Sequence, residues 1–531
     1  MTAESGGRDV RRDVAVAVLA GAVAFLVAAL LSSRELGGLG GDDAEYVLLA
    51  RSLRERLAYV SDWEPGATGP HTLYPPLLPL LLVPFVGSAP DSFLGCHLLL
   101  AGCGGVAVGL LTLLFARRGL PLPAAAAGAL APALSELWIR GAVDVLSELP
   151  FLALLTGALL ALEPPAGGVR TRRRAVLAAV LAAAAFLTRT AAIALVPWVL
   201  LDLLVRRRGG GRAGLPAAVG LVAAVGGWFA YGALAGSGGT YTAVLARGEG
   251  AVDAPLLERA WLGLTEVYLP NLPAFVFPSG GGLWAALGWA FWVLVLVGLV
   301  AGVLRHRTVR STEGQFVLAF GMFCAWNFRD PRFGIGMFPF ALLLALEGLA
   351  ALAARARVPR ASAVVGVGAL LLLLPNAVHL ARSTFPRAAR ATPRAEGAAP
   401  GSAPPAVARF HETWWMDDAT FAAAAPPIRD YLELCRAVRT DASAPPGALV
   451  ASNPRVAALL TGRRCTTVAP GEAPEETLTR LRAMGVELLL VDAFVNERAD
   501  ALRALVRTPG VELAQVGRIG TAHLLRIAPP R

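Results

Sequence analysis

The chain has 531 residues, of which 56% are hydrophobic and only 16% are charged, and its formal net charge is +10. A soluble globular protein carries about 25% charged residues, so this composition excludes an ordinary soluble protein and indicates a polytopic α-helical membrane protein. A β-barrel is also excluded, because its spans would alternate in polarity over roughly ten residues, and the Leu, Ala and Val runs here do not alternate.

The positive charge comes from arginine, since the sequence contains no lysine, and the arginines gather in short loops between apolar segments. Such loops are cytoplasmic by the positive-inside rule. The charge therefore reports membrane topology, and we expect no nucleic-acid partner. The first apolar stretch is long enough to remain as an anchor rather than to be removed as a signal peptide.

Residues 1–381 are predicted to form a transmembrane catalytic domain with about eleven helices, each of which crosses or nearly crosses a bilayer. We place them at residues 14–31, 92–115, 121–138, 144–162, 175–188, 191–205, 213–235, 282–304, 314–328, 334–354 and 361–380. With the N-terminus in the cytoplasm, the arginine loops follow every second span. The C-terminus is then extracytoplasmic.

The external first loop, residues 32–91, contains the stretch GDDAEY at 41–46. Asp42 followed by Glu45 is typical of a helix start in which the aspartate side chain accepts from a backbone N–H of the first turn. The apolar residues that follow at helical spacing predict an amphipathic helix on the outer membrane surface. Asp42 and Asp43 also lie where a general base would meet a lipid-borne substrate, so a cap and a catalytic group are both open readings.

The segment LYPPLLPLLLVPF, residues 73–85, has four prolines in an apolar run. Proline removes backbone donors and breaks regular helices, so we expect a re-entrant or surface-lying segment that walls a cavity. A kinked ordinary helix is the alternative.

Further charged residues are predicted to reach the same face of the membrane. Ionisable residues at a membrane edge are functional candidates, although a single arginine there often only snorkels to water. They are Arg140, Asp144, Glu148, Arg189, Arg329, Asp330 and Arg332.

The composition changes after residue 381. Residues 382–425 are rich in Pro, Ala and Gly, which predicts a linker. In residues 426–531 helical patterns alternate with short strands at 448–452, 487–492, 511–517 and 522–528, which predicts a small extracytoplasmic α/β domain. It has no phosphate-binding glycine loop, and Cys435 and Cys465 are candidates for a disulfide if the domain is extracytoplasmic.

Taken in order, the motifs DDAEY, TLYPPLLPL, LSELPF, FLTRT and DPRFGIGMFPF resemble the GT-C polytopic glycosyltransferases, among them protein O-mannosyltransferases and the enzymes that add aminoarabinose to lipid A. The C-terminal part is similar to the extracytoplasmic tail of bacterial members. The resemblance implies a GT-C-like fold. It also implies inverting transfer of a sugar from a polyprenyl-phosphate donor to an acceptor hydroxyl.

By position in these motifs, Asp42 matches the family's catalytic aspartate, and Asp43 stands where the family usually has glutamate. Which of the two is the base stays open. Arg332 occupies the late arginine–aromatic position, and we expect it to hold the donor phosphate together with Arg189. The remaining candidates for substrate binding are Glu45, Tyr46, Tyr74, Glu148 and Arg329.

The chemistry fits these residue types, because transfer needs a base for the acceptor hydroxyl and cations for the departing phosphate. Arginine offers a planar fork for phosphate oxygens. No His/Cys cluster has metal-ligand spacing, so we expect no cofactor, and a divalent cation on Asp42 and Asp43 has no support. The expected partners are a polyprenyl-phosphate sugar and a lipid, glycan or protein acceptor.

Two rival functions are a flippase or transporter for a lipid-linked sugar and a non-catalytic membrane scaffold. A transporter would have charges in mid-span and symmetric repeats, which the sequence lacks. An enzyme requires Asp42, Arg189 and Arg332 around one cavity. The alanine- and arginine-rich composition indicates a GC-rich bacterial genome, so we expect the bacterial plasma (inner) membrane, with the C-terminal domain outside the cytoplasm.

Overall fold

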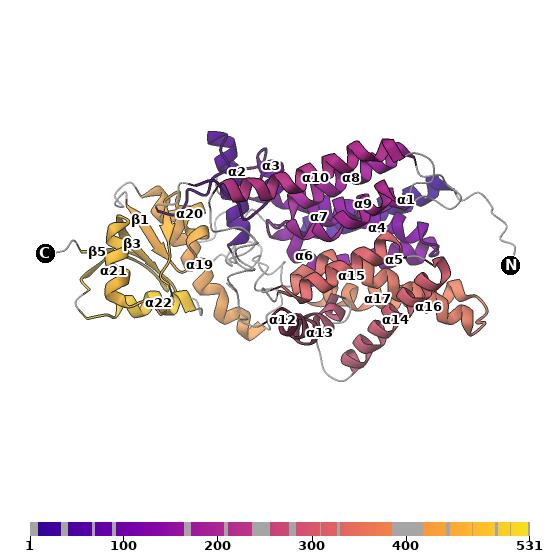
Figure 1. The fold of residues 1–531 in the computed structure, drawn as a ribbon. Coiled ribbons are helices and arrows are strands. Elements are labelled where there is room, and N and C mark those ends of the chain that lie inside the picture. The colour runs from indigo at the N-terminus through magenta and orange to yellow at the C-terminus, as the bar shows by residue number, and fades with distance from the viewer. Residues whose placement is uncertain are drawn as a thin grey trace.

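The computed structural model describes residues 9–32, 41–65, 69–87, 92–163, 171–205, 211–235, 255–275, 283–307, 309–326, 330–384, 418–441, 447–469, 471–493, 497–509 and 511–528. Its helices form a long bundle. The N-terminal end of the chain lies at one end of this bundle, and the C-terminal domain lies at the other (Figure 1).

Six helices of the described chain are long and apolar enough to cross a membrane. A seventh span exists if the bent pair α5 (Leu122–Ala133) and α6 (Glu136–Val143) is taken as one. The protein is therefore a multi-pass membrane protein. The six helices are α1 (Val10–Leu31), α4 (Leu94–Arg117), α10 (Gly211–Leu234), α14 (Leu283–His306), α16 (Phe338–Arg355) and α17 (Ala361–His379).

The expected number of about eleven spans is corrected to six or seven. Every predicted segment contains a helix, but several of these helices are too short to cross alone. An apolar composition predicts burial, whereas the length of the helix depends on where prolines and caps interrupt it. The short helices are α7 (Glu148–Leu162), α8 (Arg172–Thr188), α9 (Val196–Leu204), which follows a 3₁₀ turn (Thr190–Ala194), and α15 (Ser311–Cys324).

The bend between α5 and α6 divides the predicted span 121–138. The two helices meet at 67°. Pro132 lies at the end of α5, and Ser135 caps α6 by accepting from the Trp138 N–H at 3.2 Å. The predicted spans 121–138 and 144–162 leave a turn between them, but α6 continues through Arg140 to Val143 and α7 begins at Glu148, so the turn lies further along the chain.

Glycines bring α1 and α4 into close contact. A Cβ built on Gly21 would lie 2.5 Å from the Gly105 carbonyl oxygen, and one on Gly105 would lie 2.7 Å from that of Gly21. Small residues permit this approach between membrane helices. Gly109 of α4 faces Ala17 of α1, so the two helices run antiparallel, and the end of α4 lies on the side where α1 begins.

At that end, Arg118 binds three glutamates, a group named here the Arg118 cluster. Arg118 follows α4, Glu163 follows α7, Glu313 lies in α15 and Glu347 lies in α16. The closest contacts from the guanidinium are 3.1 Å to Glu163, 2.6 Å to Glu313 and 2.8 Å to Glu347. The cluster therefore ties four helices together at the end of the bundle remote from the C-terminal domain.

Shorter elements connect these helices. Between α10 and α14 lie α12 (Leu256–Leu262), a π-helical turn (Gly263–Tyr268), α13 (Leu269–Asn271) and a 3₁₀ turn, η3 (Leu272–Phe275). A 3₁₀ helix, η4 (Pro331–Gly336), precedes α16, and a π turn, η5 (Leu380–Thr384), follows α17.

The external loop forms α2 (Asp42–Arg56) and α3 (Leu77–Leu82). The predicted helix α2 is present, but the expectation that its apolar face rests on lipid is wrong. Val47 and Leu49 are completely buried in a cluster that includes Tyr431 and Leu459 of the C-terminal domain. Arg51 also donates to the Leu459 carbonyl oxygen at 3.1 Å. Protein therefore covers the side of α2 that the sequence pattern assigned to the membrane surface.

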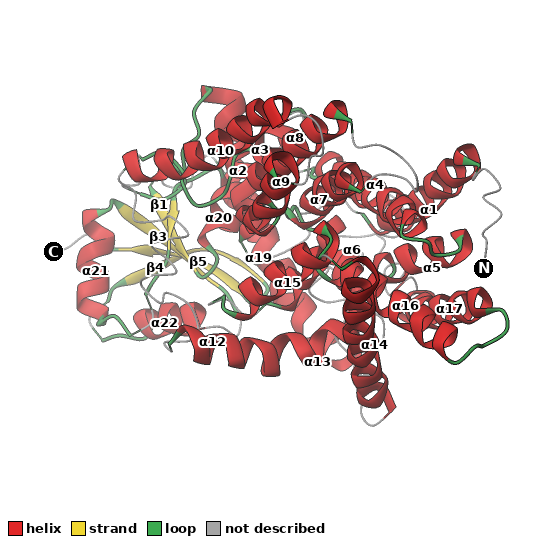
Figure 2. Ribbon diagram, turned by 45° about the vertical axis from the view of Figure 1, so that its right-hand side comes forward, coloured by secondary structure: helices red, strands yellow, loops and turns green. Residues whose placement is uncertain are grey.

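The C-terminal domain is a mixed sheet with helices around it (Figure 2). The strand order is β2-β1-β3-β5-β4, with β1 parallel to β2 and β3, and with β5 antiparallel to β3 and β4. The elements are α19 (Asp418–Thr440), β1 (Ala448–Ala451), α20 (Pro454–Thr461), β2 (Cys465–Thr466), α21 (Pro474–Ala483), β3 (Val486–Val491), α22 (Glu497–Val506), β4 (Leu513–Ile519) and β5 (Ala522–Ile527).

Most predicted elements of this domain are present, and three details differ. The two-residue strand β2 was missed, because it is too short to show a period. The helix α19 begins at Asp418, inside the predicted linker, of which residues 385–417 lie outside the described chain. Cys435 and Cys465 are both buried free thiols, so the structure does not contain the suggested disulfide.

Candidate active site

A cavity of about 850 Å³ lies where the helical bundle meets the C-terminal domain. Its wall is formed by α2, the segment before α3, the start of α7, the turn after α8, α15, η4 and two helices of the C-terminal domain. Seven residues that the sequence singled out share this wall: Asp42, Tyr46, Tyr74, Glu148, Arg189, Asp330 and Arg332.

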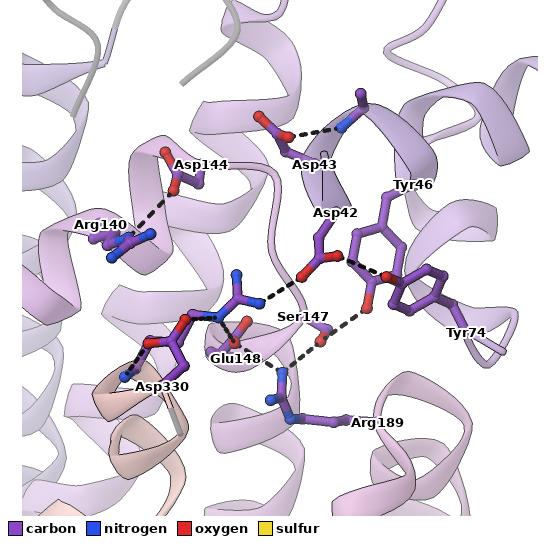
Figure 3. Close-up of polar contacts among 12 residues, drawn as sticks. Asp42, Asp43, Tyr46, Tyr74, Arg140, Asp144, Ser147, Glu148, Arg189 and Asp330 are labelled. Atoms are coloured by element: carbon purple, nitrogen blue, oxygen red, sulfur yellow. Dashed lines mark hydrogen bonds and ion pairs between the residues drawn. The ribbon is translucent and has the colours of Figure 1, made fainter. Parts of the chain in front are cut away.

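Asp42 is the first residue of α2 and not its cap. The cap position belongs to Gly41, whose φ of 86° lies in the left-handed region that suits glycine. The expected capping hydrogen bond from the Asp42 side chain is therefore absent, and the carboxylate turns to the cavity instead. It accepts from the Tyr74 hydroxyl at 2.6 Å (Figure 3). It also accepts from the Arg332 guanidinium at 2.5 Å and lies 3.5 Å from that of Arg455.

These partners determine the charge of Asp42. Burial by itself would raise the pKa of this carboxyl, because it disfavours the charged form. The positive charge of Arg332, the hydrogen bond from Tyr74 and the charge of Arg455 outweigh burial, so the pKa of Asp42 lies below its ordinary value. Asp42 is thus a carboxylate at neutral pH and is able to accept a proton.

Asp43 faces another direction. Its buried carboxylate accepts from the Ala44 backbone N–H at 2.9 Å, and it points away from Tyr74 and Glu148 in Figure 3. It does not belong to the cavity wall. The two adjacent aspartates therefore have different surroundings, and it is Asp42 that meets the cavity.

Arg332 lies in η4, whose first turn is capped by Asp330. The Asp330 side chain accepts from the Arg332 backbone N–H at 2.9 Å and pairs with its guanidinium at 2.8 Å. The same guanidinium lies 3.8 Å from Glu148. Burial lowers the pKa of Arg332, but the charges of Glu148, Asp42 and Asp330 outweigh that effect and raise it.

Arg189 ends α8 and approaches Arg332 from the other side. It pairs with Glu148 at 2.8 Å and donates to the Ser147 hydroxyl at 3.0 Å, and the Tyr46 hydroxyl donates to that same oxygen at 3.2 Å. Both guanidinium groups lie over the Phe333 ring, at 4.8 Å for Arg189 and 5.5 Å for Arg332. The motifs LSELPF, FLTRT and DPRF thus converge on one point.

Glu45 lies behind the cavity in a buried network that positions Tyr74. The Tyr74 backbone N–H donates to Nε2 of His71 at 2.9 Å, so Nε2 is unprotonated and the proton of the neutral ring is on Nδ1. That Nδ1 meets the Ser61 hydroxyl at 2.5 Å, and Ser61 donates to Glu45 at 2.7 Å. Burial, aided by the charge of Arg455, lowers the pKa of His71 to about 3, so the ring stays neutral.

The same surroundings act on Glu45 in the opposite direction. Burial raises its pKa above the ordinary value, although Arg455, at 3.1 Å, and the hydrogen bond from Ser61 act to lower it. Glu45 is predicted from the sequence as a substrate-binding residue. Its place in the structure is behind Asp42, where it holds Arg455.

Two cavity residues were missed by the sequence analysis. Arg455 is the second residue of α20, and Arg498 is the second residue of α22. A signal was available, since a cation in the first turn of a helix opposes the helix dipole, and the sequence predicts helices at 454–460 and 497–506. An arginine at such an unfavourable position indicates a partner of negative charge elsewhere in the fold.

Two other predicted residues lie elsewhere. Arg140 and Asp144 form an ion pair with each other at 3.7 Å. Neither residue belongs to the cavity wall. Arg329 lies outside the described residues. Within the described ranges, no group of three or more His, Cys, Asp or Glu side chains is arranged to hold a metal ion.

Much of the remaining wall is apolar. Leucine, isoleucine, phenylalanine and methionine side chains continue from the charged end of the cavity, at Leu73, Ile193, Phe229, Leu256, Met322 and Phe323. The segment 73–85 thus walls the cavity, as predicted, through Leu73 and Tyr74. Such a space accommodates a molecule with a charged head and a hydrocarbon tail.

A bundle of membrane helices with this cavity under a small mixed-sheet domain has the GT-C membrane glycosyltransferase fold. The structure of ArnT from Cupriavidus metallidurans in the apo state is similar over 97% of this chain and 99% of that chain, with a TM-score of 0.56 and 17% identity. For the same protein bound to undecaprenyl phosphate the coverage is the same, the TM-score is 0.53 and the identity is 16%.

An oligosaccharyltransferase from Archaeoglobus fulgidus, in complex with Zn and sulfate, matches 89% of this chain and 67% of its own, with a TM-score of 0.52 and 13% identity. Comparison of sequences alone finds no matching family model and no matching curated protein. The structural likeness confirms the predicted fold class, a helical membrane domain with a small C-terminal α/β domain.

Proposed function

We propose that the protein transfers a sugar from a polyprenyl-phosphate donor to an acceptor hydroxyl, with inversion at the sugar carbon, on the extracytoplasmic face of a bacterial plasma membrane. The observation that carries this proposal is the convergence of Asp42, Arg189 and Arg332 on one cavity that also has an apolar stretch of wall. The similar fold of ArnT, which has been solved with undecaprenyl phosphate bound, supports this class of donor.

In the proposed reaction, the acceptor oxygen attacks the sugar carbon while the bond from that carbon to the phosphate oxygen breaks. The hydroxyl proton passes to the Asp42 carboxylate, and the electron pair of the broken bond leaves with the phosphate. Asp42 suits the role of general base because it faces the cavity and is ionised at neutral pH. Asp43, which faces away, is the alternative.

Arg332 and Arg189 are assigned to the donor phosphate, whose negative charge they would stabilise as it leaves. Arg332 already holds Asp42 at 2.5 Å. A phosphate that binds this guanidinium competes with Asp42 for it, and the loss of that contact raises the pKa of Asp42. Donor binding would therefore make the carboxylate a stronger base before the acceptor hydroxyl arrives.

The test compares Asp42→Asn with Asp43→Asn in purified protein given radiolabelled polyprenyl-phosphate sugars and membrane acceptors. Loss of a general base lowers rates by about 10²- to 10⁴-fold, so we expect that loss for Asp42→Asn and near-normal transfer for Asp43→Asn. Both proteins should elute like the unmodified protein, although Asp42→Asn loses the stability that the pair with Arg332 provides. Normal transfer by Asp42→Asn would exclude Asp42 as the base.

A further inference from the structure

The charges that line the cavity do not balance. Four arginines reach its wall, at positions 189, 332, 455 and 498, together with three carboxylates, Asp42, Glu148 and Asp330. Three of the arginines are held by carboxylates at 3.1 Å or less: Arg189 by Glu148, Arg332 by Asp42 and Asp330, and Arg455 by Glu45.

Arg498 differs from the other three. Among the described residues, no carboxylate pairs with its guanidinium, and it is exposed to the cavity. Its helix is anchored by Leu502 and Leu505, each 1% exposed, which pack on the sheet of the C-terminal domain. Arg498 is therefore presented on a fixed support and is not part of a flexible tail.

Arg498 does not stabilise the helix in which it lies. It stands in the first turn of α22, where the partial positive charge of the helix end repels a cation. An anion in the cavity would relieve that repulsion. An anion that binds Arg189, Arg332 or Arg455 must instead share a guanidinium whose charge a carboxylate already offsets.

We infer that Arg498 is an anion-binding residue by which the C-terminal domain takes a phosphate-type group in the cavity. This inference rests on the proposed function and adds a contact from the soluble domain to it. The anionic group belongs either to the polyprenyl-phosphate donor or to the acceptor. In both cases a charge-assisted bond from a guanidinium to phosphate oxygens forms.

The first arm of the test uses radiolabelled undecaprenyl phosphate and the full-length protein in lipid nanodiscs, without turnover. Loss of one hydrogen bond to a charged group weakens binding by roughly ten- to a hundredfold. Arg498→Ala should show this loss for undecaprenyl phosphate and none for uncharged undecaprenol. The matched control, Arg507→Ala, removes an exposed arginine at the other end of α22, outside the cavity wall.

The second arm measures binding of inorganic pyrophosphate to protein that is saturated with undecaprenyl phosphate. If the anion is part of the acceptor, Arg498→Ala weakens pyrophosphate binding and leaves the lipid affinity unchanged. Unchanged affinity in both arms overturns the inference while the proposed function stands. If the unmodified protein binds neither undecaprenyl phosphate nor pyrophosphate, the inference and the proposed donor class both fail.

Discussion

Replacing Arg118 by alanine is expected to destabilise the membrane domain. The guanidinium makes five hydrogen bonds: two to Glu347 at 2.8 and 2.9 Å, two to Glu313 at 2.6 and 3.2 Å, and one to Glu163 at 3.1 Å. These bonds use all five N–H donors of the guanidinium. Arg118→Ala therefore leaves three carboxylates close together without the cation that holds them.

The loss of unfolding free energy in Arg118→Ala depends on which of the three glutamates has access to water. Glu163 and Glu347 are 12% and 17% exposed and can be hydrated, whereas Glu313, at 1%, cannot. One fully buried carboxylate thus loses its partner, and breaking a buried pair by removing one member costs about 3–5 kcal/mol. Five separate charged hydrogen bonds would sum to more than this, but hydration of the two exposed glutamates offsets part of the loss.

The assay is thermal unfolding of purified protein in detergent, followed by loss of helical circular dichroism. Arg117→Ala is the control, because Arg117 is adjacent and donates at 2.8 Å to a backbone carbonyl and not to a carboxylate. Adding Glu313→Gln to Arg118→Ala should recover part of the loss, since it removes the stranded charge. The reasoning would be refuted if Arg118→Ala unfolded at the same temperature as the Arg117→Ala control. It would also be refuted if the double variant were no more stable than Arg118→Ala.

Three further predictions concern the site and the bundle. Because the pKa of Asp42 is lowered, its charge and the stability it provides persist until the pH falls below the ordinary aspartate range. The acid limb of the pH profile of kcat/KM should therefore lie below that range. An acid limb near neutral pH would contradict the assignment of Asp42. His71→Ala removes the group that holds the Tyr74 backbone, so kcat should fall more than KM rises and the acid limb should move upward; an unchanged profile would make His71 merely structural. A Cβ on Gly105 lies 2.7 Å from a backbone oxygen of α1, whereas a Cβ on Gly102 meets nothing within 4 Å. Gly105→Ala should therefore lower the melting temperature and Gly102→Ala should not, and equal melting would refute the packing argument.

Local chemistry made much of the site predictable. The acidic start at Asp42 and the proline-rich segment at Tyr74 are short patterns whose physical meaning does not depend on the rest of the chain. The role of Asp42 within its helix was predicted wrongly because Gly41, in a left-handed conformation, takes the cap position. A capping pattern specifies a helix start only to within a residue or so.

Long-range contacts were not predictable in this way. Arg455 and Arg498 reach the cavity only because α2 packs against the C-terminal domain, and no local pattern encodes that packing. The bend at Pro132 and Ser135 was missed for a related reason, since the apolar run continues across it unchanged. Hydropathy reports how apolar a segment is, whereas the direction of the chain depends on single caps and prolines.

The contact between Arg51 and the Leu459 carbonyl oxygen joins positions 408 residues apart. A ribosome that adds about 5–20 residues per second needs roughly 20–80 s to make that interval. For all that time the apolar side of α2 lacks the surface that later covers it. The nascent chain must therefore shelter this helix on lipid or on a chaperone until translation is nearly finished, and release of that temporary partner becomes the last step of maturation.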